Sequence, residues 1–139
     1  MLLIIDKYIP FVKETIGQTV LPDWQQVQVS ALEPEEITHQ AVRNADALMV
    51  RTRTKINREL LEGSSVRLVA TATIGYDHID QDYCRKTGIA WLSCPGCNAQ
   101  AVCDYVEEAL LEQKIPLNAK KIGIVGVGHV GTLVAQMAE

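Results

Sequence analysis

Short, continuously apolar runs alternate with segments of helical periodicity along the first two thirds of the chain. The apolar runs are candidate strands at residues 2–5, 27–29, 47–50, 67–70 and 89–92, and helices are expected at 11–16, 35–44, 58–62 and 81–86. Continuously apolar strands are typical of a parallel sheet with both faces covered. The pattern predicts an α/β fold with a doubly wound parallel sheet that resembles the flavodoxin arrangement.

Residues that commonly cap helices stand at the ends of several of these expected helices. Asn57 and Asp80 precede helical segments, where a side-chain oxygen caps free backbone N–H groups. Gly17, Gly63 and Gly88 stand where a left-handed residue ends a helix. These positions support the predicted boundaries.

A longer helix is expected at residues 99–112, with Asn98 as a candidate N-cap. Its apolar positions follow the spacing of a single helix face and are Val102, Tyr105, Val106, Ala109 and Leu110. Pro116 then breaks the pattern, and a polar lead reaches an apolar run at 122–125. We expect a domain boundary here, with a first domain at 1–97 and a second that starts at 98–139.

A glycine motif of the form G-x-G-x-x-G, at Gly126, Gly128 and Gly131, follows the apolar run at 122–125, where we expect a strand, and opens a helix at 132–139. This is the context of the first βα unit of a Rossmann domain, where glycines let the backbone approach a pyrophosphate and the helix N-terminus faces it. The second strand of such a unit, with a ribose-binding acid about 20 residues on, does not occur before Glu139. We therefore expect the chain to be the N-terminal part of a longer polypeptide.

Composition narrows the function classes. The chain is 47% apolar and 22% charged, the balance of a globular domain, and its net charge of −4 argues against general nucleic-acid binding. No run approaches the ~18 apolar residues of a membrane span, and the start does not resemble a secretion signal. We expect a cytoplasmic protein that has neither nucleic acid nor membrane as a partner, and whose four cysteines are free thiols.

Three cations, Arg51, Arg53 and Lys55, follow the third expected strand and alternate with Thr52 and Thr54. If this segment is extended, the cations share one face. An anion site for carboxylate or phosphate is one interpretation, because Arg offers paired donors and Thr adds a hydroxyl. A charged, solvated sheet edge is the other. Spacing alone does not separate the two.

The segment after the fourth expected strand also suits an anion. Its small residues and Gly75 leave backbone N–H groups accessible at the carboxyl end of a strand. His78 lies between Asp77 and Asp80, where a structural hydrogen-bonding role is more typical than catalysis. The full segment is Thr71-Ala-Thr73-Ile-Gly75-Tyr-Asp77-His78-Ile-Asp80.

Cys94 and Cys97 form a C-x-x-C pair between a strand and a helix, where a helix N-terminus lowers a thiol pKa. A non-enzymatic module, either ligand-binding or thiol-redox, is therefore an alternative of a different class. The motif follows the fifth strand rather than the first central one, which disfavours a thioredoxin-like role. The pair supplies only two zinc ligands, so we expect no metal site.

Together these motifs resemble the D-isomer-specific 2-hydroxyacid dehydrogenases. The resemblance covers nearly the whole chain and rests on the segments 49–57 and 71–80, on Pro95-Gly-Cys-Asn-Ala99, and on the glycine motif. The resemblance implies an NAD-dependent oxidoreductase, a homodimer, that oxidises the C2 hydroxyl of 4-phospho-D-erythronate to the 2-oxo acid in vitamin B6 synthesis. A dehydrogenase for another acid, such as phosphoglycerate, is the nearest alternative.

The resemblance also assigns residues. Substrate-binding positions carry over to Thr52 and Thr73, and the phosphorylated 2-hydroxy acid gives Arg51 and Gly75 a role beside them. Cofactor-binding positions carry over to the three motif glycines with His129 and Val130, where the family more often has Asn in place of His129. The catalytic Arg, Glu and His of the family lie beyond Glu139, so no catalytic residue is expected in this chain.

Overall fold

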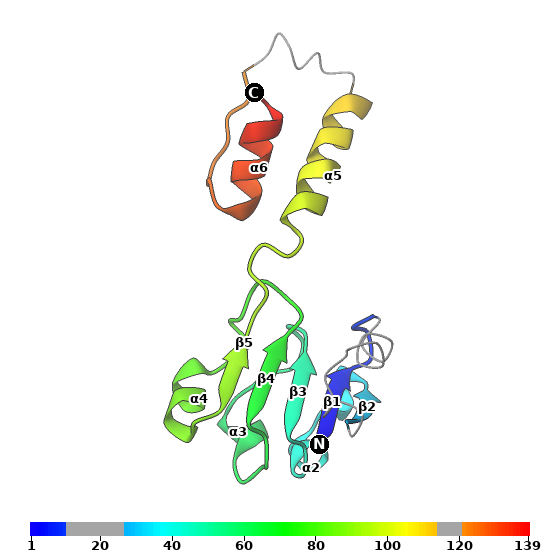
Figure 1. Ribbon diagram of the computed structural model, residues 1–139, viewed down its shortest axis with the longest axis vertical. Coiled ribbons are helices and arrows are strands. Elements are labelled where there is room, and N and C mark those ends of the chain that lie inside the picture. Colours follow the sequence, from blue (N-terminus) through cyan, green and yellow to red (C-terminus); the bar gives the residue numbers. More distant parts are fainter. Residues whose placement is uncertain (11–26, 114–120) are drawn as a thin grey trace. The chain divides into compact units, whose positions relative to one another are not determined.

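The computed structural model describes residues 1–10, 27–113 and 121–139. Contacts divide the chain into two compact units, Met1–Cys94 and Pro95–Glu139 (Figure 1). The division falls within three residues of the boundary expected from sequence. That the units belong to a substrate domain and a nucleotide domain remains a prediction.

The first unit is built on a five-stranded parallel sheet, as predicted. Its strand order is β2-β1-β3-β4-β5, which is the flavodoxin-like order (Figure 1). In chain order the strands are β1 (Leu2–Asp6), β2 (Gln28–Leu32), β3 (Ala47–Val50), β4 (Leu68–Thr71) and β5 (Ala90–Leu92). All pairs are parallel, so the carboxyl ends of the strands share one edge of the sheet.

Apolar side chains cover both faces of this sheet. On one face, Ile4, Leu48 and Val69 join a core with residues of helices α2 (His39–Val42), α3 (Arg58–Leu61) and α4 (Gln81–Thr87). On the other, Leu3, Ile5 and Ala47 form a smaller cluster. The helix expected at 11–16 lies outside the described residues, as does Gly17.

The prediction of a single helix at 35–44 is wrong. The segment instead forms a 3₁₀ turn, η2 (Pro34–Glu36), followed by the separate helix α2. The Thr38 hydroxyl accepts a hydrogen bond from the Ala41 N–H at 3.4 Å, and its extended backbone breaks the helix before α2. Ile37 is buried at this break, so the two short pieces are fixed by packing.

The other helix ends largely follow the sequence. The Asn57 and Asp80 side chains accept from backbone N–H groups at 3.0 and 2.9 Å, as predicted. Gly63 and Gly88 have positive φ angles of 70° and 73°, as expected of residues that end a helix. Asn98 occupies the N-cap position of the helix that begins at Ala99, as predicted, but its side chain forms no capping hydrogen bond, because its ψ of 9° is not the extended conformation that lets a side chain reach back.

The second unit contains two helices that pack against each other, α5 (Ala99–Glu112) and α6 (His129–Met137). The predicted bounds of α5 are confirmed, but Tyr105 of its expected apolar stripe is 71% exposed. The expected strand at 122–125 is wrong. No described residue pairs with it, and a strand without ladder partners leaves its backbone groups unpaired.

Helix α6 begins at His129, three residues earlier than expected, so Gly131, the last glycine of the motif, lies in its first turn. Among the described residues, no helix is both long and apolar enough to cross a membrane.

Candidate functional site

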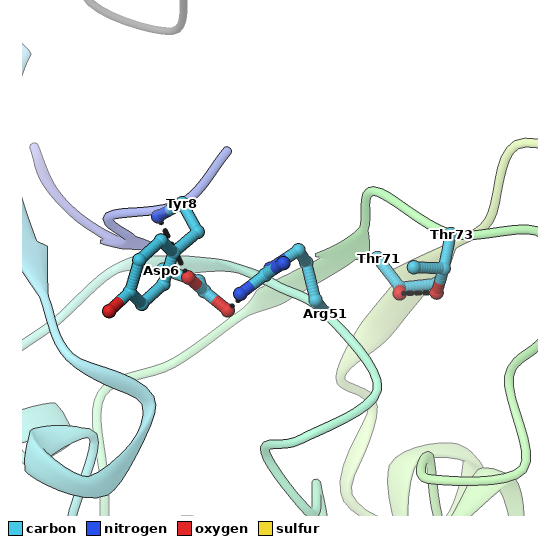
Figure 2. Close-up of polar contacts among 5 residues, drawn as sticks. All are labelled: Asp6, Tyr8, Arg51, Thr71 and Thr73. Carbon is cyan, nitrogen blue, oxygen red and sulfur yellow. Dashed lines mark hydrogen bonds and ion pairs between the residues drawn. The ribbon is translucent and has the colours of Figure 1, made fainter. Parts of the chain in front are cut away.

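The carboxyl edge of the sheet carries a cluster of polar side chains in the first unit. Asp6 ends β1, Arg51 follows β3, and Thr71 ends β4 (Figure 2). Strands β1 and β4 flank β3, so the three side chains leave neighbouring strands at one edge. In this strand order the crossover direction reverses between β1 and β3, and ligands of open parallel sheets bind at that switch point.

An ion pair bridges the switch point. The Asp6 carboxylate is fully buried and accepts a hydrogen bond from Arg51 Nε at 2.9 Å. Its other oxygen accepts the Tyr8 backbone N–H, also at 2.9 Å. The Arg51 guanidinium lies over the Tyr8 ring, 5.0 Å from the centroid. A buried carboxylate is tolerated only with such partners, so the pair fixes Arg51 in place.

The three cations after β3 do not share a face, which corrects the extended arrangement expected above. The chain turns at Arg51, and the Thr54 N–H donates to the Arg51 carbonyl at 3.2 Å. Thr54 is buried at this turn, while Thr52, Arg53 and Lys55 are exposed. Arg53 and Lys55 form no ion pair with any described residue. Of the three cations, Arg51 is the one that an ion pair holds in place at the carboxyl edge of the sheet.

The hydroxyls after β4 form a short chain of hydrogen bonds. Thr71 Oγ1 lies 2.6 Å from Thr73 Oγ1 (Figure 2). The Thr73 hydroxyl donates to the Gly75 carbonyl at 3.0 Å. Because Thr73 donates its one proton to Gly75, the nearly buried Thr71 hydroxyl must donate to Thr73. Thr73 is thereby held in one orientation. Thr73 is half-buried, and Gly75 is exposed.

Thr52 lines an open cavity of about 350 Å³ in the first unit. His78 lines it too, and burial lowers the pKa of this imidazole, although Asp77 opposes the shift. Neither ring nitrogen of His78 has a hydrogen-bond partner among the described residues. The hydrogen-bonding role expected for the ring is therefore not observed among the described residues. The His78 backbone is structural instead, since its carbonyl accepts the Ile56 N–H at 2.8 Å.

The glycine motif forms a tight turn into α6 in the second unit. Gly126 has φ of +92°, and a Cβ built on Gly131 would overlap the Gly126 carbonyl oxygen. Gly131 therefore lets the start of α6 sit against the loop. Gly128 is the N-cap position, so His129 and Val130 form the first turn of the helix.

A second glycine meets this loop from the start of α5. Gly96 has φ of +75°, and a Cβ there would come within 3.1 Å of the His129 ring. The Pro95–Ala99 segment and the glycine motif are thus in contact inside one unit. No pattern in the sequence predicts this packing.

The cysteines remain free, with Cys94 and Cys97 exposed and Cys84 and Cys103 buried. Among the described residues, no group of three or more His, Cys, Asp or Glu side chains is arranged to hold a metal ion.

Two residues of the site were missed by sequence reasoning, Asp6 and Tyr8. The signal was present for Asp6, because an acid directly after the apolar run 2–5 lies at the carboxyl end of a buried strand. Tyr8 carries no comparable signal, since its contribution is a backbone N–H and a ring face.

The first unit is an α/β fold with polar side chains at the carboxyl edge of its parallel sheet, and comparison with known proteins gives the family of the chain. The model of the D-isomer specific 2-hydroxyacid dehydrogenase catalytic domain matches residues 2–138. The chain belongs to this family, which confirms the resemblance read from its motifs.

Individual relatives carry the name of one particular enzyme. The chain is 46% identical over its whole length to a protein of Bacteroides thetaiotaomicron named erythronate-4-phosphate dehydrogenase, and covers 39% of that protein. A protein of the same name from Marinomonas sp. is 57% identical over 70% of this chain, which corresponds to 27% of the relative. The chain thus spans about two fifths, or less, of the length of these relatives.

Solved structures agree on the fold. The D-lactate dehydrogenase of Aquifex aeolicus, complexed with NAD and lactic acid, aligns with a TM-score of 0.68 at 20% identity, over 99% of this chain and 48% of that one. The NAD⁺-bound 3-phosphoglycerate dehydrogenase of Entamoeba histolytica aligns with a TM-score of 0.71 at 21% identity, over 99% of this chain and 50% of that one. At this identity the likeness concerns the fold.

Proposed function

We propose that this chain supplies the substrate domain and first cofactor loop of an enzyme that oxidises 4-phospho-D-erythronate to 3-hydroxy-2-oxo-4-phosphobutanoate with NAD, in pyridoxal 5′-phosphate synthesis. The observation that carries the proposal is the 46% identity, over the whole chain, to relatives named erythronate-4-phosphate dehydrogenase. Because the chain spans 39% of those relatives, the activity is proposed for the full-length protein.

The polar edge of the first unit suits a substrate with two anionic groups. Arg51 carries a fixed positive charge, and its planar donors match the geometry of carboxylate and phosphate oxygens. Thr73 is oriented by its neighbours, and the accessible backbone around Gly75 offers further donors. We assign Arg51, Thr52, Thr73 and Gly75 to substrate binding.

The second unit suits a dinucleotide. Gly131 makes room for a close turn, Gly126 adopts a left-handed conformation, and the N-terminus of α6 opens directly after Gly128. This is the form of loop that binds a pyrophosphate through backbone N–H groups and the helix dipole. We assign Gly126, Gly128, His129, Val130 and Gly131 to NAD binding. NAD bound there would supply the hydride acceptor for C2.

The acid–base step would fall to residues outside this chain. Oxidation of a hydroxyl requires a group that takes its proton and a cation that holds the substrate carboxylate. The resemblance implies an Arg, Glu and His for these roles. We also propose, from the family resemblance, a cytoplasmic homodimer.

Steady-state kinetics of the full-length enzyme test this proposal. NADH formation is compared for 4-phospho-D-erythronate, 3-phospho-D-glycerate and D-lactate. We expect kcat/KM for phosphoerythronate to be higher than for either other acid by about 100-fold, since a site built for polar groups rejects ligands that leave them unpaired. Higher turnover of phosphoglycerate would favour the phosphoglycerate alternative, and no turnover of any acid would refute the proposal.

A matched pair of variants tests the assigned threonine. Thr73→Val removes a hydroxyl from the proposed site, and we expect KM for phosphoerythronate to rise about tenfold, the effect of losing one hydrogen bond to a charged group. Thr87→Val is the control, because its hydroxyl bonds only to carbonyls of α4. An equal KM in both variants would remove Thr73 from the site.

A further inference from the structure

Asp6 is the only charged side chain that is fully buried among the described residues. Placing a carboxylate inside a protein is costly unless it is paired and hydrogen-bonded. Its two oxygens meet this condition with one donor each, from Tyr8 N–H and Arg51 Nε. The position is the carboxyl end of β1, at the switch point where ligands of this fold bind.

The hydrogen bond to Asp6 uses only the Nε donor of the Arg51 guanidinium and leaves the two Nη groups at its end free within the described part of the chain. Arg has five N–H donors, of which Nε carries one and the two Nη groups carry four. Among the described residues, Asp6 Oδ2 is the only hydrogen-bond partner of the Arg51 side chain. The Arg51 side chain retains 33% exposure, so the Nη donors remain available to a ligand. The Tyr8 ring supports the guanidinium from its face.

We propose that Asp6 is a positioning residue, which holds the Arg51 guanidinium so that its Nη donors meet an anionic group of the substrate. This inference rests on the proposed function, because it takes the carboxylate or phosphate of a 2-hydroxy acid as the ligand of Arg51. Asp6 itself does not touch the substrate. A flexible Arg loses several rotatable bonds of freedom when it binds, and a guanidinium fixed beforehand loses less.

The same two strands offer a matched control at their opposite ends. Asp46 precedes β3, accepts the Leu2 backbone N–H of β1 at 2.7 Å, and pairs with Arg67 at 3.3 Å. Asp46 thus ties β1 to β3 with the chemistry of Asp6, but at the amino edge of the sheet. A purely structural role for Asp6 predicts that Asp6→Asn and Asp46→Asn affect the enzyme in the same way.

The experiment measures KM for 4-phospho-D-erythronate, KM for NAD and thermal stability in the full-length enzyme. In Asp6→Asn the side chain is neutral and has one oxygen for two donors, so it cannot accept from both the Tyr8 N–H and Arg51 Nε, and the guanidinium loses its charged partner. We expect KM for the acid to rise about tenfold, as for the loss of one charge-assisted hydrogen bond, with KM for NAD unchanged. Asp46→Asn is expected to lower the melting temperature and leave both KM values unchanged.

A double-variant cycle links the effect to Arg51. In an Arg51→Ala background, Asp6→Asn should cause no further rise in KM, because the group that Asp6 positions is gone. An unchanged KM in Asp6→Asn, an equal additional rise in the Arg51→Ala background, or the same KM shift in Asp46→Asn would each overturn the inference. Inactivity of the wild-type enzyme towards every phosphorylated hydroxy acid would instead refute the proposed function.

Tyr8 provides a second route if Asp6→Asn does not fold. The Tyr8 side chain is 53% exposed, so its replacement disturbs no core. Tyr8→Leu removes the ring beneath the guanidinium and should raise KM about threefold, the size of an exposed cation–π contact, whereas Tyr8→Phe keeps the ring and the wild-type KM. Equal KM values in Tyr8→Leu and Tyr8→Phe would contradict the fixed geometry of Arg51.

Discussion

The hydrogen-bonded hydroxyls of Thr71 and Thr73 after β4 lead to a prediction about the free energy of unfolding. This prediction can be tested on the 139-residue polypeptide alone. Thr71 is 1% exposed, and its hydroxyl has Thr73 Oγ1 as its partner at 2.6 Å. Thr73→Val keeps the shape of the side chain and removes that partner. A buried polar group without a partner costs about 1–3 kcal/mol, so we expect the free energy of unfolding to fall by about 2 kcal/mol.

The double variant separates this cause from a loss of packing. When Thr71→Val is added to Thr73→Val, no buried hydroxyl is left unpaired, and apolar groups of the same shape replace both partners. We therefore expect the double variant to be about 1 kcal/mol more stable than Thr73→Val alone. Thr87→Val, on the exposed end of α4, should change stability by less than about 0.5 kcal/mol.

Urea unfolding followed by tryptophan fluorescence measures these differences. Trp91 lies in β5 of the first unit, and its ring centroid is 5.2 Å from that of Tyr76, in the segment that follows Thr73. The signal therefore reports the unit that carries the variants. A double variant that is less stable than Thr73→Val would refute the reasoning, because it would show that the hydroxyls contribute independently.

Four further outcomes are expected. Arg51→Ala in the full-length enzyme should raise KM for the phosphorylated acid about tenfold in steady-state kinetics; an unchanged KM would leave only a structural ion pair. Gly131→Ala would push a methyl group against the Gly126 carbonyl and should weaken NAD binding about tenfold or more by calorimetry, whereas Gly123→Ala, with open space around it, should not. Because burial lowers the pKa of His78, the unfolded state binds a proton at higher pH than the folded state; stability should fall as pH drops below 6.5, and His78→Asn should flatten that slope in urea unfolding at several pH values. The 139-residue polypeptide itself should form no NADH with any 2-hydroxy acid in an absorbance assay, and chain-dependent turnover would contradict the assignment of catalysis to residues outside it.

The sheet was predictable because strands that are buried on both faces are continuously apolar in sequence. β3 was predicted at its observed bounds, since its four residues are apolar and lie between two neighbouring strands. β2 was shifted by up to three residues because it is an edge strand, where polar Gln28 and Ser30 interrupt the pattern. The expected strand at 122–125 does not form for a different reason. An apolar pattern does not indicate whether a neighbouring strand is present to pair with it.

The candidate site was predictable in position more than in geometry. Arg51 and Thr73 were identified because they follow strands of a parallel sheet, and this placement is observed. The alternating cations were misread as one face, since the turn at Thr54 depends on burial that the local sequence does not reveal. The partner of Arg51 lies 45 positions away, and a pairing at that separation follows from strand order rather than local pattern.

The location of Asp6 connects the fold to the proposed chemistry. Strand order 2-1-3-4-5 places the ends of β1 and β3 side by side, so a carboxylate on one and a guanidinium on the other meet without a long loop. An exposed Arg51 would spend most of its time in other rotamers, while a fully paired one would have no donors left. Contact through Nε alone satisfies the buried carboxylate and keeps the Nη groups accessible. The same ion pair can thus hold two strands together and present a positive charge to an anionic substrate.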